Sequence, residues 1–325
     1  MPDRGFTGHL IRKRLVFALV ALGLLWVAWD QSARRTPLHR AEWLQADDVQ
    51  LRAVRAGVGD TTLLLLHGYG ESLVGYRAIF DRLARHHRVI AVDLPGFGLS
   101  DKPAGPYDLP AMVRRLGDFL GRWTSGPIVV VGHSMGGEIA AALALELPDR
   151  VVAAVLLAPA GDGLGTVLGD TSSIASPGAA WFATALAFIL PVHDPAWLWE
   201  PADRASYAPL GDPAYRAAAR QVLEQFDFSA LHDRFRELHQ PTLLIWGRED
   251  PTIPYRIGEL IGAMLPCRRM IVLPNTLHRP HQAQPDTVVA EMERFLQDPG
   301  SVCRQGAAIS GQVEQSDSGQ RGHSE

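Results

Sequence analysis

The sequence has almost no cysteine and only a small excess of charge over its 325 residues. Its two cysteines, Cys267 and Cys303, are too few for a disulfide framework or a four-thiolate zinc site, and Cys303 lies in a polar C-terminal stretch. The 31 basic and 35 acidic residues leave a net charge of −4, which offers no basic surface for a phosphate backbone. We therefore expect no nucleic-acid partner and a core that depends on burial of the apolar residues, which are 47% of the chain.

The glycine-rich motifs that bind nucleotides are also missing. Residues 68–70 (GYG) and 96–98 (GFG) each lack the third glycine of a dinucleotide-binding loop, and no P-loop occurs. His278 and His281 have too few potential ligands around them for a zinc site. We expect neither a metal nor an organic cofactor.

One long apolar run does occur, at residues 15–29 (LVFALVALGLLWVAW), and it carries no charge. As a helix it would be about 22 Å long, short of the ~30 Å hydrocarbon core, a difference that snorkelling basic side chains and a thinned bilayer accommodate. The residues after it do not form a signal-peptide cleavage site, so we expect residues 1–36 to be a retained membrane anchor. The alternative is a core helix of the folded domain.

The charges around this run predict its orientation. Three basic residues at 12–14 precede it, and the positive-inside rule keeps such residues in the cytoplasm. Arg34 and Arg35 after the run weaken the asymmetry. We expect a single N-terminal membrane helix with the catalytic domain on the non-cytoplasmic side.

The middle of the chain alternates predicted strands and helices. Near-continuous Val, Ile and Leu predict strands at residues 62–66, 88–93, 128–131, 151–157, 242–246 and 269–273, with 49–55 as an outer strand. Apolar residues three and four apart predict helices at 74–85, 109–123, 136–147 and 286–296. This alternation indicates an α/β fold with a mostly parallel, doubly wound sheet.

The alternation stops between residues 160 and 239. This stretch has no convincing parallel strand but is rich in large aromatic residues: Trp181, Phe182, Phe188, Trp197, Trp199, Phe226 and Phe228. We predict a helical cap at 160–239, inserted into an α/β core formed by residues 37–159 and 240–297. The polar residues 298–325 are expected to be a disordered tail.

The strongest chemical motif is G-x-S-x-G at residues 132–136, between a predicted strand and a predicted helix. Gly132 and Gly136 allow the sharp turn that holds Ser134 in a strained conformation at a helix N-terminus, with its hydroxyl clear of the sheet. A plain tight turn is the alternative. In this context we predict that Ser134 is a nucleophile.

A serine nucleophile needs a base, and a histidine at the same sheet edge would supply it. His278 follows the last predicted strand, so it belongs at the carboxyl edge of the sheet together with Ser134. His281 is the rival candidate. His133 is adjacent to the serine on a tight turn, so we expect it to pack or to form hydrogen bonds rather than act as the base.

A carboxylate must orient the imidazole, and Asp250 lies just past the predicted strand at 242–246. Glu249 and Asp162 are alternative positions for this acid. The order serine, aspartate, histidine is the one found with a G-x-S-x-G turn.

The oxyanion of an acyl-transfer reaction needs two fixed donors. The backbone N–H of Met135, directly after the nucleophile, is one candidate. The second is the N–H of Tyr69, in the glycine-rich loop after the strand at 62–66.

Taken together, these motifs resemble the α/β-hydrolase fold superfamily, in its serine-nucleophile branch, over residues 51–296. Residues 93–100 (DLPGFGLS) resemble the loop after the family's fourth strand, and residues 246–254 look like its acid loop. The dehalogenase and epoxide-hydrolase branches have aspartate where Ser134 stands, so the resemblance disfavours those two activities. Many relatives have glycine where Leu277 precedes the histidine.

The resemblance implies a catalytic triad of Ser134, Asp250 and His278, with Tyr69 and Met135 as the oxyanion donors. The residues themselves predict hydrolysis of a carboxylic ester through an acyl-enzyme, without a cofactor. Aromatic residues in the cap and the membrane anchor favour a lipophilic acyl substrate, although the same aromatic residues also suit the core of the cap.

Two other functions stay open. A carbon–carbon bond hydrolase of the meta-cleavage-product type has a similar serine turn followed by Met, Gly and Gly, but asparagine is frequent there at the position of His133. A non-catalytic, membrane-tethered binding protein is the alternative from another class. No feature of the sequence indicates an oligomeric state.

Overall fold

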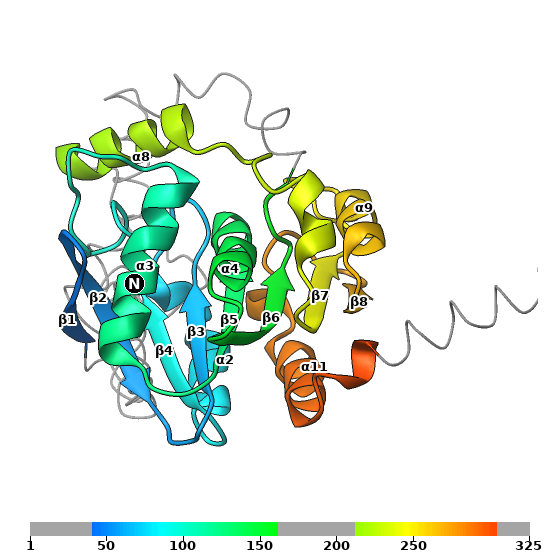
Figure 1. Cartoon of the computed structure of the whole chain (residues 1–325). Helices are drawn as coiled ribbons and strands as arrows, with labels where there is room; N and C mark the ends of the chain where they lie inside the picture. The colour runs from blue at the N-terminus through cyan, green and yellow to red at the C-terminus, as the bar shows by residue number, and fades with distance from the viewer. Residues whose placement is uncertain (1–40, 162–211, 304–325) are drawn as a thin grey trace, which may run out of the picture.

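The computed structural model describes residues 41–161 and 212–303, and its centre is an eight-stranded sheet in the order β1-β2-β4-β3-β5-β6-β7-β8 (Figure 1). The β1–β2 and β2–β4 pairs are antiparallel, and every other neighbouring pair is parallel. The mostly parallel α/β sheet is therefore confirmed. The strands are β1 (Ala41–Ala46), β2 (Val49–Ala56), β3 (Thr62–Leu66), β4 (Arg88–Val92), β5 (Ile128–His133), β6 (Val151–Leu157), β7 (Thr242–Gly247) and β8 (Arg268–Leu273).

Helices cover both faces of this sheet (Figure 1). One hydrophobic cluster joins the sheet to α3, α4, α8 and α9, and a second joins the opposite face to α2 and α11. The central strands β3 and β7 are buried along their whole length because both of their faces are covered, and apart from a first threonine they are apolar. The helices are α2 (Arg77–Leu83), α3 (Leu109–Trp123), α4 (Met135–Glu146), α8 (Pro213–Gln225), α9 (Tyr255–Met264), α10 (Pro280–Ala283) and α11 (Pro285–Gln297), with short 3-10 turns η2 (Leu73–Tyr76) and η6 (Asp233–Glu237).

The helices α3 and α4 lie on the same face of the sheet but differ in how much of their surface is buried. Helix α3 is capped by Asp108, whose side chain accepts a hydrogen bond from Ala111 N at 2.8 Å, and the helix buries only one face. Helix α4 packs against α3, β5 and β6, and its first ten residues are all buried. Its alanine-rich sequence follows from this position, since small side chains let a helix approach its neighbours on every side.

Three elements were not predicted from the sequence: β1, α9 and the four-residue helix α10. Strand β1 has few β-branched residues and an exposed Trp43, so its pattern is weak, and it pairs with β2 through a turn that begins at Asp47, with φ +52°. Helix α9 contains Gly258 and Gly262, which have low helix propensity. A Cβ at Gly258 would lie 2.5 Å from the ring of Trp246, so the glycine permits close packing of α9 on β7.

The C-terminal part of the described chain continues six residues into the predicted tail. Val302 is buried in the cluster that contains α11, and Cys303 forms a disulfide with Cys267, which lies just before β8. The two cysteines are too few for a framework but sufficient for this one bridge. Residues 298–303 therefore belong to the folded domain.

The predicted cap and anchor fall largely or wholly outside the described residues, which exclude 1–40, 162–211 and 304–325. Within the described part of the cap, at 212–239, the regular elements are α8 and η6, and the division into domains stays a prediction. The predicted cap residues Phe226 and Phe228 are buried in the core cluster. Among the described helices, none has the length and apolar character needed to cross a membrane.

We predict opposite effects for two Gly-to-Ala substitutions in helices. Gly258→Ala places a Cβ within 3 Å of Trp246 and Met270, so we expect a loss of about 1–3 kcal/mol in the free energy of unfolding. Gly121→Ala, in α3, meets no atom within 4 Å and should gain about 0.5–1 kcal/mol. Urea unfolding measures both, and a destabilised Gly121→Ala or an unchanged Gly258→Ala would contradict this packing.

Candidate active site

Ser134 lies on a strained turn between β5 and α4. Its φ of +51° and ψ of −120° are rare for a residue with a side chain and cost about 1–3 kcal/mol. A Cβ at Gly132 would lie 2.1 Å from the carbonyl oxygen of Gly136, and one at Gly136 would lie 2.2 Å from that of Leu66. The two glycines are therefore required for the turn, which brings Ser134 to the carboxyl edge of the sheet.

Asp250 and His278 meet at this edge. Asp250 Oδ2 accepts a hydrogen bond from His278 Nδ1 at 2.8 Å, and the Asp250 side chain is fully buried. Its other oxygen, Oδ1, accepts from the backbone N–H groups of Thr252 and Ile253, at 2.8 and 2.9 Å. The carboxylate is thus held from two sides, and the bond to Nδ1 leaves Nε2 of His278 as the free proton acceptor.

Burial lowers the pKa of His278 from its ordinary value of 6.5. The hydrogen bond to Asp250 opposes this shift, while the neighbouring His133 adds to it. The ring is therefore neutral near pH 7, which is the form that a base requires.

In the described part of the chain, the Ser134 hydroxyl and the His278 ring form no hydrogen bond with each other. Both residues contact His133: it precedes Ser134 in the chain, and its ring centroid lies 4.8 Å from that of His278. Hydrogen bonds between a nucleophile and its base are often long without substrate and tighten in the complex. The structure therefore brings two members of the predicted triad, Asp250 and His278, into direct contact.

The alternative candidates for the base and for the acid lie in different surroundings. His281 is 1% exposed, both of its ring nitrogens are without a hydrogen-bond partner among the described residues, and it packs on Tyr76. Burial lowers its pKa well below 6.5. Glu249 accepts a hydrogen bond from Thr276 N at 3.1 Å and so supports the His278 loop, while Asp162 lies outside the described residues.

The predicted oxyanion donors lie on two turns that touch. Met135 is the first residue of α4, where a backbone N–H has no partner within the helix. Tyr69 follows β3, and a Cβ at the preceding Gly68 would lie 3.2 Å from Ser134 Cβ. The loop is held by His67, which accepts from Leu94 N at 2.9 Å, and by the Tyr69 hydroxyl, which donates to Ala219 O in α8 at 3.2 Å.

Two residues that the sequence did not single out also belong to this edge. Glu71, after β3, pairs with Nδ1 of His133 at 3.0 Å and with Arg279, the residue after His278. The only sequence signals for these two residues were a glutamate just after the glycine-rich loop and an arginine next to His278. The expectation that His133 forms hydrogen bonds matches these contacts.

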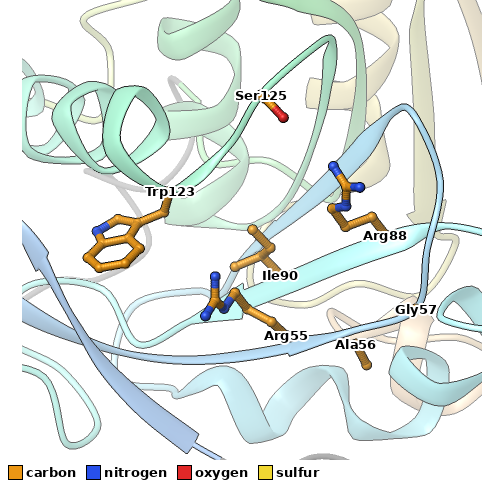
Figure 2. Close-up of a pocket in the computed structure, with 7 residues that line it drawn as sticks. All are labelled: Arg55, Ala56, Gly57, Arg88, Ile90, Trp123 and Ser125. Atoms are coloured by element: carbon orange, nitrogen blue, oxygen red, sulfur yellow. The ribbon is translucent and has the colours of Figure 1, made fainter.

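A separate pocket of about 340 Å³ lies at the opposite end of the sheet, where β2 ends and β4 begins (Figure 2). It contains no serine–histidine–carboxylate set, so it does not compete with Ser134 as a catalytic site. The described residues also include no group of three or more His, Cys, Asp or Glu arranged to hold a metal. The pocket is lined by Arg55, Ala56, Gly57, Arg88, Ile90, Trp123 and Ser125.

Comparison with known proteins gives matches over most of the chain. A family model described as alpha/beta hydrolase fold matches residues 61–281. A 2-hydroxy-6-oxo-2,4-heptadienoate hydrolase of Pseudomonas putida is 30% identical over 236 residues, which cover 66% of this chain and 81% of that protein. The crystal structure of a bacterial membrane phospholipase A is similar with a TM-score of 0.66 at 23% identity, covers 90% of this chain and 99% of that one, and at this identity shows the fold alone.

A further relative is similar over a shorter segment. The dihydrolipoyllysine-residue acetyltransferase component of the acetoin cleaving system of Cupriavidus necator is 35% identical over 147 residues. These cover 45% of this chain and 39% of that protein, so the present chain matches well under two thirds of that relative's length.

Proposed function

Because the chain belongs to the alpha/beta hydrolase fold family, we propose that it cleaves a carboxylic ester through a covalent acyl-serine intermediate. The observation that carries the proposal is the 2.8 Å hydrogen bond between Asp250 and His278, at the sheet edge where the strained Ser134 turn lies. A nucleophile on a turn and an oriented imidazole are the two parts that acyl transfer needs.

The proposed reaction has two steps. Ser134 Oγ attacks the ester carbonyl while His278 Nε2 takes its proton, and the N–H groups of Tyr69 and Met135 donate to the oxyanion. His278 then protonates the departing alcohol. Water, deprotonated by the same imidazole, attacks the acyl-enzyme and releases the carboxylic acid. Asp250 stabilises the imidazolium in both steps without accepting its proton.

We further propose that the acyl group is lipophilic. Leu277, next to His278, is 59% exposed, and an exposed apolar side chain beside a site favours an apolar ligand. The aromatic rings near the oxyanion loop add no support, because Phe97, whose ring lies 5.5 Å from that of Tyr69, and Tyr215 of α8 are both buried in the core cluster. Phe226 and Phe228 do not support this proposal, since both belong to the core.

A second candidate is hydrolysis of a carbon–carbon bond. Its support is the 30% identity to the heptadienoate hydrolase of Pseudomonas putida, of which this chain covers 81%. The same triad would serve, with a ketone in place of the ester. His133 in place of asparagine favours the ester.

We propose that residues 15–29 anchor the protein in a membrane and that the domain lies on the non-cytoplasmic side. The Cys267–Cys303 disulfide supports the non-cytoplasmic location, because structural disulfides persist mainly in oxidising compartments.

Cell fractionation tests the anchor. We expect the full chain in the membrane fraction, released by detergent and not by high salt, and a variant lacking residues 1–36 in the soluble fraction. Release of the full chain by salt would contradict the anchor.

The nucleophile is tested by covalent labelling. We expect a fluorophosphonate to label the wild-type protein and not Ser134→Ala, because the probe reacts only with an activated serine. Ser125→Ala, an exposed serine at the remote pocket, is the control and should label like the wild type. Mass spectrometry identifies the labelled residue, and an unlabelled wild type would favour the binding-protein function instead.

The substrate is tested with p-nitrophenyl esters of increasing chain length. Each buried methylene adds about 0.8 kcal/mol, so we expect kcat/KM to rise from acetate to octanoate by at least about tenfold. A preference for acetate would contradict the lipophilic acyl group. Faster turnover of a 2-hydroxy-6-oxo-dienoate than of any ester would favour the second candidate.

A further inference from the structure

The clearest unexplained feature is a buried ion pair directly behind the proposed catalytic histidine. His133 is 1% exposed and the Glu71 side chain is 10% exposed, and Nδ1 of the ring lies 3.0 Å from Oε2 of the carboxylate. The other ring nitrogen, Nε2, lies 2.9 Å from the backbone carbonyl oxygen of His278. One ring thus connects the loop after β3, the end of β5 and the loop before α10.

The partners of this ring decide its protonation. A carbonyl oxygen only accepts, so Nε2 of His133 carries a proton. Glu71 Oε2 also accepts from Gly68 N at 3.1 Å, and Oε1 accepts from Arg279 Nε, which are the contacts of an ionised carboxylate. An ionised carboxylate only accepts as well, so Nδ1 carries a second proton.

The environment of Glu71 agrees with this assignment. Burial by itself raises the pKa of its carboxyl group, but the charge and hydrogen bond of His133, followed by the charge of Arg279, hold it well below 4.5. A buried charge without such partners would be costly, so the two ions stabilise each other.

We infer that His133 is a positioning residue, an imidazolium paired with Glu71 that fixes the backbone of His278 through its carbonyl oxygen. This inference rests on the proposed function of His278 as the base. The fixed backbone sets where the imidazole stands relative to Ser134, and misplacement by about 1 Å can cost 100-fold in rate. The cation also opposes protonation of the His278 ring, whose centroid is 4.8 Å away.

The balance of charge around the two rings predicts the direction of a pH effect. Removing the His133 cation while Glu71 remains negative raises the pKa of His278, so the base becomes active only at higher pH. The ionisable groups that face the two rings in the described part of the chain are His67, Glu71, Tyr76, Asp250, Arg279 and His281.

Two measurements on the intact protein test this inference: ¹⁵N NMR of the His133 ring and the pH profile of ester hydrolysis. At pH 7 we expect both ring nitrogens of His133 to be protonated in the wild type and only one in Glu71→Gln. His133→Asn should lower kcat at least about tenfold and move the acid limb of kcat/KM up by about one pH unit. His87→Asn, at a partly exposed His–Glu pair whose Nε2 lies 3.0 Å from Glu293, is the matched control and should leave both unchanged.

The ion pair and the positioning role of His133 are each overturned by a different result. A singly protonated His133 in the wild type would overturn the ion pair, and an unchanged kcat and acid limb in folded His133→Asn would overturn the positioning role. Should His133→Asn fail to fold, His133→Gln decides, because it also removes the cation while Glu71 remains negative, and an unchanged acid limb in that variant would overturn the role of the imidazolium. A doubly protonated His133 in a protein that hydrolyses no ester would leave the ion pair intact and reject the proposed function.

Discussion

The close approach of three backbone segments at the carboxyl edge of the sheet is the constraint on which the site depends. Gly132 and Gly136 leave no room for a Cβ at the Ser134 turn, and a Cβ at Gly68 would lie 2.9 Å from His133 Nδ1. Since no side chain separates these segments, the loop after β3 lies directly on the serine turn. The strain at Ser134 persists because the packed sheet on one side and α4 on the other hold it.

Burial of charge at this edge follows from the same close packing. Asp250 and Glu71 each lie among backbone or guanidinium donors and one histidine ring. Their roles differ because the rings differ: His278 has one carboxylate and one open nitrogen, whereas His133 has an acceptor at both nitrogens. The two neighbouring histidines are therefore held differently: one keeps a nitrogen open at the site, and the other is engaged at both nitrogens by distant loops.

Much of the fold could be predicted because it is encoded locally. The buried strands are near-continuous Val, Ile and Leu, and α3 has a clear amphipathic period together with its Asp108 cap. The elements that were missed depend on contacts instead. Strand β1 forms because β2 offers it a partner, and α9 tolerates two glycines because Gly258 packs against Trp246.

The sequence by itself determined the α/β alternation, the strained turn at Ser134 and the short set of candidate acids and bases after later strands. Only the tertiary structure decided that the carboxylate bonded to His278 is Asp250 rather than Glu249, and that His281 is buried without a hydrogen-bond partner among the described residues. It alone revealed the pair of Glu71 and His133, which lie 62 positions apart. The reason is physical: a turn depends on the residues within it, whereas the acceptor that a ring nitrogen faces depends on how distant loops pack.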